Sequence, residues 1–236
     1  MPRMVVTEIT RFANKDLVCT AGIEVESGRC IRPMPYLESH RCRDLGMVPG
    51  AILSGEFSHS PDAEEPHIED MKYKNLTYHG PCTNQQFREI LADSAVESIE
   101  EGFAVVMPTA DKCIAPSMRP QRSLITIAVP PQSIQLAPDN FNTKNVKCHF
   151  IDRSGKEFRY LTVTDLGLSD LVERVGNEQV CDEIQRVLED QIEVYLRVGL
   201  SRKYQVQDGR VGYWVQVNGI YSFPDFYRPA RHYQSK

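Results

Sequence analysis

Aromatic residues and amides near the C-terminus are the residues whose types and spacing most clearly suggest binding chemistry. The segment from residue 213 to 233, YWVQVNGIYSFPDFYRPARHY, contains the only tryptophan of the chain, Trp214. Side chains alternate between the two faces of a β-strand. Trp214, Gln216 and Asn218 therefore lie on one face, and the opposite, core face carries Tyr213, Val215 and Val217. An indole can stack on a base while amide groups hydrogen-bond to the base edge. The first face is therefore a candidate binding face.

The residues that follow this strand extend the same chemistry. A bulge or a tight bend is predicted at Asn218–Gly219, after which Tyr221 restarts the alternation, and Pro224 ends the strand. Arg228 lies in the tail FYRPARHY. A guanidinium group can stack on a ring or bind phosphate. The alternative interpretation is a tryptophan in a barrel wall with the tail packed along the outside.

Two further stretches combine cations with conformationally restricted or small residues. GRCIRPMPY (28–36) carries Arg29 and Arg32, and its prolines stiffen the strand end. GLSRKY (199–204) brings Ser201, Arg202 and Tyr204 together where an apolar strand ends. Either stretch could bind an anion through planar guanidinium groups and a hydroxyl. Solvated arginines at the edge of a barrel would explain the same residues.

Composition limits the classes of function. The formal net charge of −5 argues against a protein that coats nucleic acid without specificity. The 7 cysteines form no C-x-x-C pair, so buried thiols in a reducing compartment are expected, with no metal and no cofactor. No run of 18 or more apolar residues is present, and a cytoplasmic location without membrane attachment is expected. The common hydrolase, phosphate-loop, zinc-protease and dinucleotide motifs are absent, which leaves catalysis uncertain and favours a protein that is not an enzyme.

Charge is distributed unevenly along the chain. Residues 56–101 hold eleven Asp and Glu against three Lys and Arg, whereas residues 197–236 hold seven Lys and Arg against two Asp. The C-terminal region could therefore face an anion, and the acidic segment 56–101 could bind a basic protein partner.

The pattern of elements predicts mainly β structure with helical insertions. Runs rich in Val, Ile and Thr predict strands in the first third, and a helical segment is expected within residues 83–103, with Thr83 as its N-cap. A hairpin is predicted around residues 153–156, followed by two helices and two paired strands. Short strands in two groups predict two small barrels packed together, a β-rich α+β arrangement. The double proline at 130–131 predicts a boundary between a domain of residues 1–131, with an acidic insertion around 56–101, and a domain of residues 132–236.

Two motifs together resemble a known family. CTAGIEVESGRCIRP (19–33) and the pair GLSR (199–202) and WVQVNGIYSFPD (214–225) are similar to the bacterial dual-OB-containing proteins. The resemblance implies two OB (oligonucleotide/oligosaccharide-binding) barrels. It also implies binding of nucleic acid or nucleotides, often in association with bacterial defence systems.

The leading hypothesis is a module that binds single-stranded nucleic acid or a nucleotide. Aromatic residues would stack on the ligand and arginines would hold it, in an accessory component of a defence system. One alternative is a protein-interaction scaffold with purely structural barrels. Another is an enzyme acting on a nucleotide or nucleic acid between the two barrels.

Overall fold

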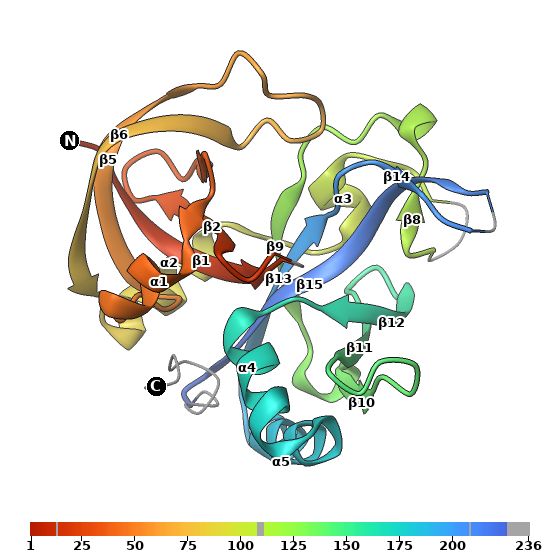
Figure 1. Ribbon diagram of the computed structural model, residues 1–236. Coiled ribbons are helices and arrows are strands. Elements are labelled where there is room, and N and C mark those ends of the chain that lie inside the picture. The colour runs from red at the N-terminus through yellow and green to blue at the C-terminus, as the bar shows by residue number, and fades with distance from the viewer. Residues whose placement is uncertain (13, 108–110, 208, 226–236) are drawn as a thin grey trace.

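Strands form two sheets in this protein, with helices between and beside them. The computed structural model describes residues 1–12, 14–107, 111–207 and 209–225. Figure 1 shows the first barrel, coloured red to gold, beside the second, coloured green to blue, with β13 and β15 running through the centre of the molecule. Mainly β structure with helical insertions is confirmed.

The first barrel closes on itself. Its strands are β1 (Arg3–Arg11), β2 (Leu17–Glu24), β3 (Cys30–Met34), β5 (Ala51–His59) and β6 (Asp70–Pro81). They follow the order β1-β5-β6-β3-β2, and pairing of β1 with β2 completes the circle. Only β3 and β6 are parallel within this ring. This is the strand order of an OB barrel. The short β4 (Leu37–Glu38) and α1 (Ser39–Asp44) connect β3 to β5.

The acidic segment 56–101 is largely part of this barrel. The end of β5 and the whole of β6 lie within it, and both strands belong to the closed ring. The loop of residues 60–69 joins the two strands and carries many of the acidic side chains. Most of the segment is therefore barrel wall and hairpin loop.

A connecting region leads from the first barrel to the second. It contains α2 (Asn84–Asp93), β7 (Ala95–Val96), α3 (Ile99–Phe103), β8 (Cys113–Ile114) and the 3-10 turn η1 (Pro116–Met118). Thr83 caps α2 in a capping box with Gln86, as predicted. The helical segment is interrupted, because β7 pairs with β9 and Ser98 caps a second helix, α3.

The second barrel repeats the topology of the first. Its elements are β9 (Leu124–Val129), the 3-10 turn η2 (Pro131–Ser133), β10 (Gln135–Pro138), β11 (Val146–Ile151), β12 (Glu157–Val163), α4 (Leu166–Val175), α5 (Asn177–Glu189), β13 (Glu193–Leu200), β14 (Tyr204–Gln205) and β15 (Val211–Phe223). The sheet runs β10-β11-β12-β15-β13-β9. Since only η2 separates β9 from β10, these two strands act as one bent first strand. The order is then that of the first barrel, again with one parallel pair, β12 and β15.

The double proline lies at this bend. Pro130 and Pro131 provide no backbone N–H, so the ladder stops after Val129 and restarts in β10. β7 and β9 precede residue 131 and belong to the sheet of the second barrel. A boundary drawn after residue 131 therefore falls between two strands of this sheet, β9 and β10.

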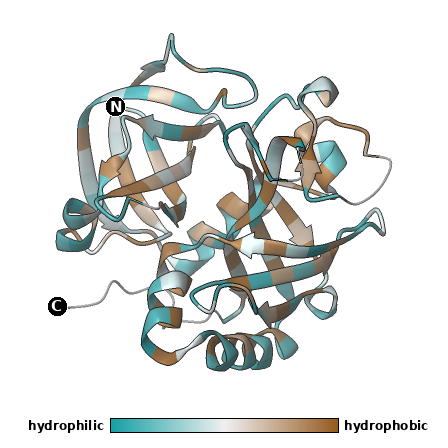
Figure 2. Cartoon of the chain, turned by 45° about the vertical axis from the view of Figure 1, so that its right-hand side comes forward, coloured by the Kyte–Doolittle hydropathy of each residue, from teal (hydrophilic) through white to brown (hydrophobic). Residues whose placement is uncertain are grey.

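Each barrel has its own core, and a third cluster joins them. The largest core fills the second barrel and extends to α3, α4 and α5. A smaller core fills the first barrel. The third cluster contains Val5, Phe87, Leu91, Tyr195, Tyr221 and Phe223, from β1, α2, β13 and β15. Figure 2 shows hydrophobic residues gathered along the central strands, while the outer loops are mostly hydrophilic.

Candidate functional site

Arg32 is held inside the molecule by an ion pair. It lies on the outer side of β3 and is buried, with its Nε atom 2.5 Å from Asp70 Oδ1. Its Nη2 atom lies 3.1 Å from the Nδ1 atom of His67. Its guanidinium group is therefore engaged by the protein itself.

Arg202 meets the same carboxylate from the second barrel. Its Nη2 atom donates to Asp70 Oδ2 at 2.7 Å and to the hydroxyl of Tyr36 at 3.2 Å. Asp70 is buried, while 46% of the Arg202 side chain is exposed. The segment that follows β13 is thereby tied to β6 and to the residues that follow β3 in the first barrel.

His67 is a neutral member of this cluster. Burial lowers its pKa from 6.5 to about 3, and the neighbouring Arg202 and Arg32 act in the same direction. Neutral Nδ1 can accept the N–H of Arg32, so the proton lies on Nε2. A backbone group of Ser201 also interacts with the ring and acts in the opposite direction on its pKa.

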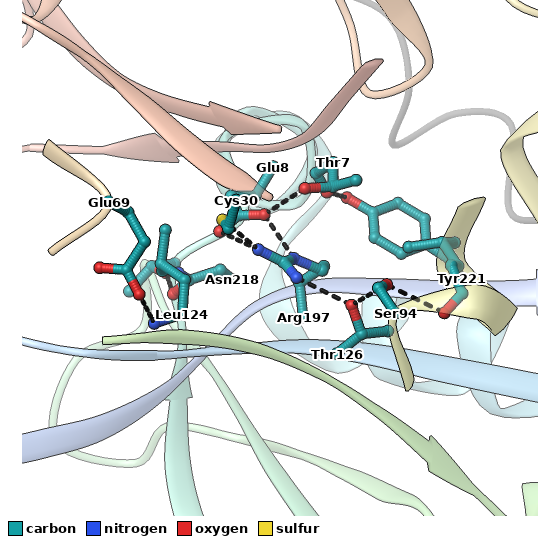
Figure 3. A network of polar contacts seen from close by, with 12 residues as sticks. Thr7, Glu8, Cys30, Glu69, Ser94, Leu124, Thr126, Arg197, Asn218 and Tyr221 are labelled. Carbon is teal, nitrogen blue, oxygen red and sulfur yellow. Dashed lines mark hydrogen bonds and ion pairs between the residues drawn. The ribbon is translucent and has the colours of Figure 1, made fainter. Parts of the chain in front are cut away.

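A buried polar network connects the two barrels near their centre (Figure 3). Arg197 on β13 donates from Nε and Nη2 to the carboxylate of Glu8 on β1, at 2.6 and 3.1 Å. Arg197 also donates to Thr126 Oγ1 and to the sulfur of Cys30. Both charged side chains are almost fully buried. The charges therefore compensate each other across the interface.

Two more contacts continue this interface along β9 and β15. Glu69 accepts hydrogen bonds from the backbone N–H groups of Ser123 and Leu124 and from the Ser123 hydroxyl. The Tyr221 hydroxyl donates to the carbonyl of Thr7. Tyr221, predicted to contact a ligand, is instead buried between the barrels.

These contacts decide which barrel surface is open. In OB barrels the ligand usually lies on the outer face of the second and third strands. In the first barrel those strands are β2 and β3, whose outward residues include Cys30 and Arg32. Both are in contact with the second barrel or with the loop packed against it. The second barrel thus covers this part of the face in the first.

The period-two prediction for β15 is confirmed by the core. Tyr213, Val215 and Val217 pack in the core of the second barrel, and Trp214 does not. Gly219 pairs with Arg197 and Val217 with Val198, so Asn218 between them is the extra residue of the predicted bulge. Asn218 is buried and accepts a hydrogen bond from the Thr164 hydroxyl. It therefore stabilises the strand junction.

Trp214 lies beneath other side chains. Its ring and that of Tyr204 have centroids 5.7 Å apart, tilted by 33°, and the guanidinium of Arg210 lies 5.2 Å from the centroid of the indole. Trp214 is 9% exposed and Tyr204 is 48% exposed. The ring surface available to a ligand therefore belongs to Tyr204. We call Tyr204, Trp214 and Arg210 the aromatic stack.

Ser201 holds this region in place. Its hydroxyl accepts the backbone N–H of Trp214 at 2.9 Å, and its own N–H donates to the carbonyl of Trp214. The hydroxyl also donates to the carbonyl of Arg202. Ser201 is thus a positioning residue at the exit of β13.

A second outward surface continues from the aromatic stack. Gln216 follows Trp214 on the same side of β15 and pairs with Thr162 on β12. Thr162 accepts a hydrogen bond from Lys147 on β11 at 2.9 Å. We call the outward residues Lys147, His149, Tyr160, Thr162 and Gln216 the free face. It lies on the second, third and fifth strands of the second barrel.

The aromatic members of the free face were missed by sequence reasoning. His149 and Tyr160 pack edge to face, with centroids 4.6 Å apart, and Tyr160 is exposed. Burial, followed by the charge of Arg159, lowers the pKa of His149, which keeps its ring neutral near pH 7. The alternation of Lys147 and His149 in the predicted hairpin indicates that these side chains point to the same face. The sequence does not show which strands lie beside this hairpin, so it could not show that this face is open.

Two predicted site residues remain, Arg29 and Arg228. Arg29 is exposed and lies 3.4 Å from Glu24 at the hairpin between β2 and β3. Arg228 is outside the described residues. The structure thus joins Arg32, Ser201, Arg202, Tyr204 and Trp214 through shared contacts, and Gln216 adjoins them. It does not join Arg29 to this group.

Metal and membrane features can be stated for the same residues. Among the described residues no group of three or more His, Cys, Asp or Glu side chains could hold a metal ion. None of the helices in this part of the chain has the length and apolar character needed to cross a membrane.

Two barrels of OB topology in one chain, joined through a buried polar interface, define a dual-OB protein. A family model described as Dual OB-containing domain matches residues 4–220, and the chain belongs to this family. No curated protein matches the chain in a sequence comparison.

Proposed function

We propose that this protein binds single-stranded nucleic acid or a nucleotide on the second barrel. The ligand would lie across the free face and the aromatic stack. The observation that carries the proposal is the exposed ring of Tyr204, which packs against Trp214, whose indole also contacts the guanidinium of Arg210. Such a ring offers a stacking surface to any base.

The covered face of the first barrel also supports a ligand site on the second barrel. Its outward Arg32 is neutralised by Asp70 and buried. The corresponding strands of the second barrel carry partly or fully exposed side chains, including Tyr160 and His149. An OB-type ligand surface is thus accessible in the second barrel.

Exposed cations on the second barrel suit a phosphate backbone. Lys203 is exposed beside Tyr204, and Lys144 is exposed in the loop between β10 and β11. The side chain of Arg202 is 46% exposed although it pairs with Asp70. Binding is therefore expected to weaken with salt, with few phosphate contacts.

Substitution of Tyr204 tests this proposal. Tyr204→Ala should weaken binding of a fluorescent single-stranded oligonucleotide by roughly 5- to 150-fold, because stacking contributes about 1–3 kcal/mol per base. Tyr204→Phe keeps the ring and should bind like the wild type. Fluorescence anisotropy at low salt, with DNA and RNA probes and mononucleotides, measures the effect.

Charge variants supply the matched control. Lys203→Gln should lower the dependence of log K on log salt by about one unit, whereas Arg174→Gln on α4 should leave it unchanged. Absence of binding to every probe by folded wild-type protein would contradict the proposal. Binding only to a basic protein partner through the loop of residues 60–69 would favour the scaffold alternative.

The proposal extends to a role as an accessory component of a bacterial defence system. This role follows from the family resemblance and rests on the binding function. Loss of phage resistance in cells that carry the Tyr204→Ala variant, with Tyr204→Phe as the control, would support it. Equal resistance with both variants would contradict it.

A further inference from the structure

The first barrel has an open mouth where its strands separate. A cavity of about 890 Å³ lies between the end of β3, at Met34 and Pro35, and the hairpin formed by β5 and β6. Figure 1 shows the loop of that hairpin extending beyond the barrel. Barrel mouths are common ligand sites, and pockets that bind small molecules are usually of this size.

The inner wall of the cavity is apolar and aromatic. Phe57 and Tyr73 are directly opposite each other on β5 and β6, so their side chains share one face. Both pack against the core of the first barrel while they line the cavity. Met34 and Pro35 complete this wall. A flat ring could be inserted against these side chains.

The rim of the cavity carries balanced charge. Lys72 and Lys74 face Glu56 and Asp62, and Lys72 lies 3.8 Å from Asp62. Asp70 also lines the cavity, but Arg32 and Arg202 occupy both of its carboxylate oxygens. The cavity therefore favours neither an anion nor a cation by net charge.

Hydrogen-bonding groups are nevertheless dense around the rim. Ser58 and Ser60 can donate and accept, the lysines donate, and the carboxylate of Glu56 accepts. A ligand with an apolar ring and both donors and acceptors on its edge would match this set. A fully apolar ligand would leave these groups without partners.

We propose that the mouth of the first barrel binds an uncharged, flat heteroaromatic molecule with a polar edge, of the nucleoside class. The ring lies against Phe57 and Tyr73, and its polar edge faces hydroxyl and charged groups that line the same cavity. This site is on a different barrel from the free face, so it does not depend on the proposed function.

Calorimetric titration with adenosine, uridine, adenosine monophosphate and ribose tests the site. Saturable binding of at least one nucleoside is expected, with no saturable binding of ribose and no gain in affinity from the phosphate. Phe57→Ala and Tyr73→Ala should each weaken nucleoside binding by about tenfold, the loss expected for one aromatic contact. Tyr73→Phe retains the ring and should keep the wild-type affinity. Thermal unfolding of each variant verifies that it is folded.

The Tyr204→Ala variant separates this site from the proposed nucleic-acid surface. It should bind the nucleoside like the wild type even if oligonucleotide binding is lost. Nucleoside binding without any oligonucleotide binding would support the cavity and contradict the proposed function. Absence of nucleoside binding to folded wild-type protein, or its loss in Tyr204→Ala with retention in Phe57→Ala, would overturn the inference.

Discussion

Arg32, Arg202 and His67 show how one carboxylate organises a cluster of residues. Asp70 accepts from both arginines, and one of them also donates to the neutral His67. Arg32, a candidate for phosphate binding in the sequence, is therefore buried and paired within the protein itself. The sequence marks Arg32 as a candidate for contact with an anion but does not identify its partner inside the protein, because Asp70 is 38 positions from Arg32.

The shifted pKa of His67 predicts that the stability of the protein depends on pH. Its native pKa of about 3 is below the value of 6.5 expected after unfolding, so the unfolded state binds more protons between these values. The free energy of unfolding should therefore fall as the pH falls through this window, by roughly 2 kcal/mol between pH 7 and pH 5 from this residue. Urea unfolding at several pH values measures it.

His67→Gln is the matched variant, because an amide oxygen can still accept from Arg32. The loss of stability between pH 7 and pH 5 should be smaller in this variant than in the wild type. Equal pH dependence in the two proteins would contradict the assignment of a buried neutral histidine.

At the scale of elements, the bulge in β15 shows what local sequence can predict. The pair Asn218–Gly219 indicated an irregularity in the strand, and the pairing of β13 with β15 shifts register at this position. Alternation along the strand also separated core from outward residues correctly at Trp214. The pattern could not show that the same strand contacts the first barrel at Tyr221. Only pairing of distant strands determines that.

The same limit explains the interruption at residues 94–98 and the bend at Pro130–Pro131. A helical period continues in the sequence, but Ala95 and Val96 pair with β9, which ends the helix. The two prolines predict a domain boundary because they interrupt the backbone hydrogen bonds of a β-strand. Whether a ladder resumes in the same sheet depends on β10 pairing with β11, which is a long-range property.

Close packing around Gly199 predicts that a larger residue at this position destabilises the protein. A Cβ atom at this position would lie 2.4 Å from Asn218 Nδ2 and 3.1 Å from a methyl group of Leu124. Gly199→Ala should therefore lower the free energy of unfolding by about 1–3 kcal/mol, the usual cost of overpacking. Denaturant titration measures the change. In an Asn218→Ala background the same substitution should cost less, and an equal cost in both backgrounds would contradict the contact.

At the scale of the whole molecule, the two barrels are joined by polar and apolar contacts together. The Glu8–Arg197 ion pair crosses the interface beside the cluster of Val5, Tyr195 and Tyr221. Sequence patterns predict two barrels, but they do not predict their mutual orientation. That orientation covers one candidate binding face and leaves the other open.

The interfacial ion pair gives a third prediction. Arg197→Met alone should destabilise the protein by about 3–5 kcal/mol, because it leaves the Glu8 charge buried without its partner. The double variant Glu8→Leu with Arg197→Met should recover most of that loss. A double-mutant cycle from denaturant unfolding measures the coupling. Additive effects of the two single changes would contradict a direct buried pair.

The most direct test of the binding surface is an NMR titration with a single-stranded oligonucleotide. Backbone amide shifts are expected to change in β11, β12 and residues 201–207 and 209–216, with Tyr204, Tyr160 and His149 among the largest changes. Amides of β2 and β3, whose outer face is covered in part by the second barrel, should remain unchanged. Shift changes concentrated in the first barrel, with none on the free face, would contradict the proposal that the second barrel carries the nucleic-acid surface.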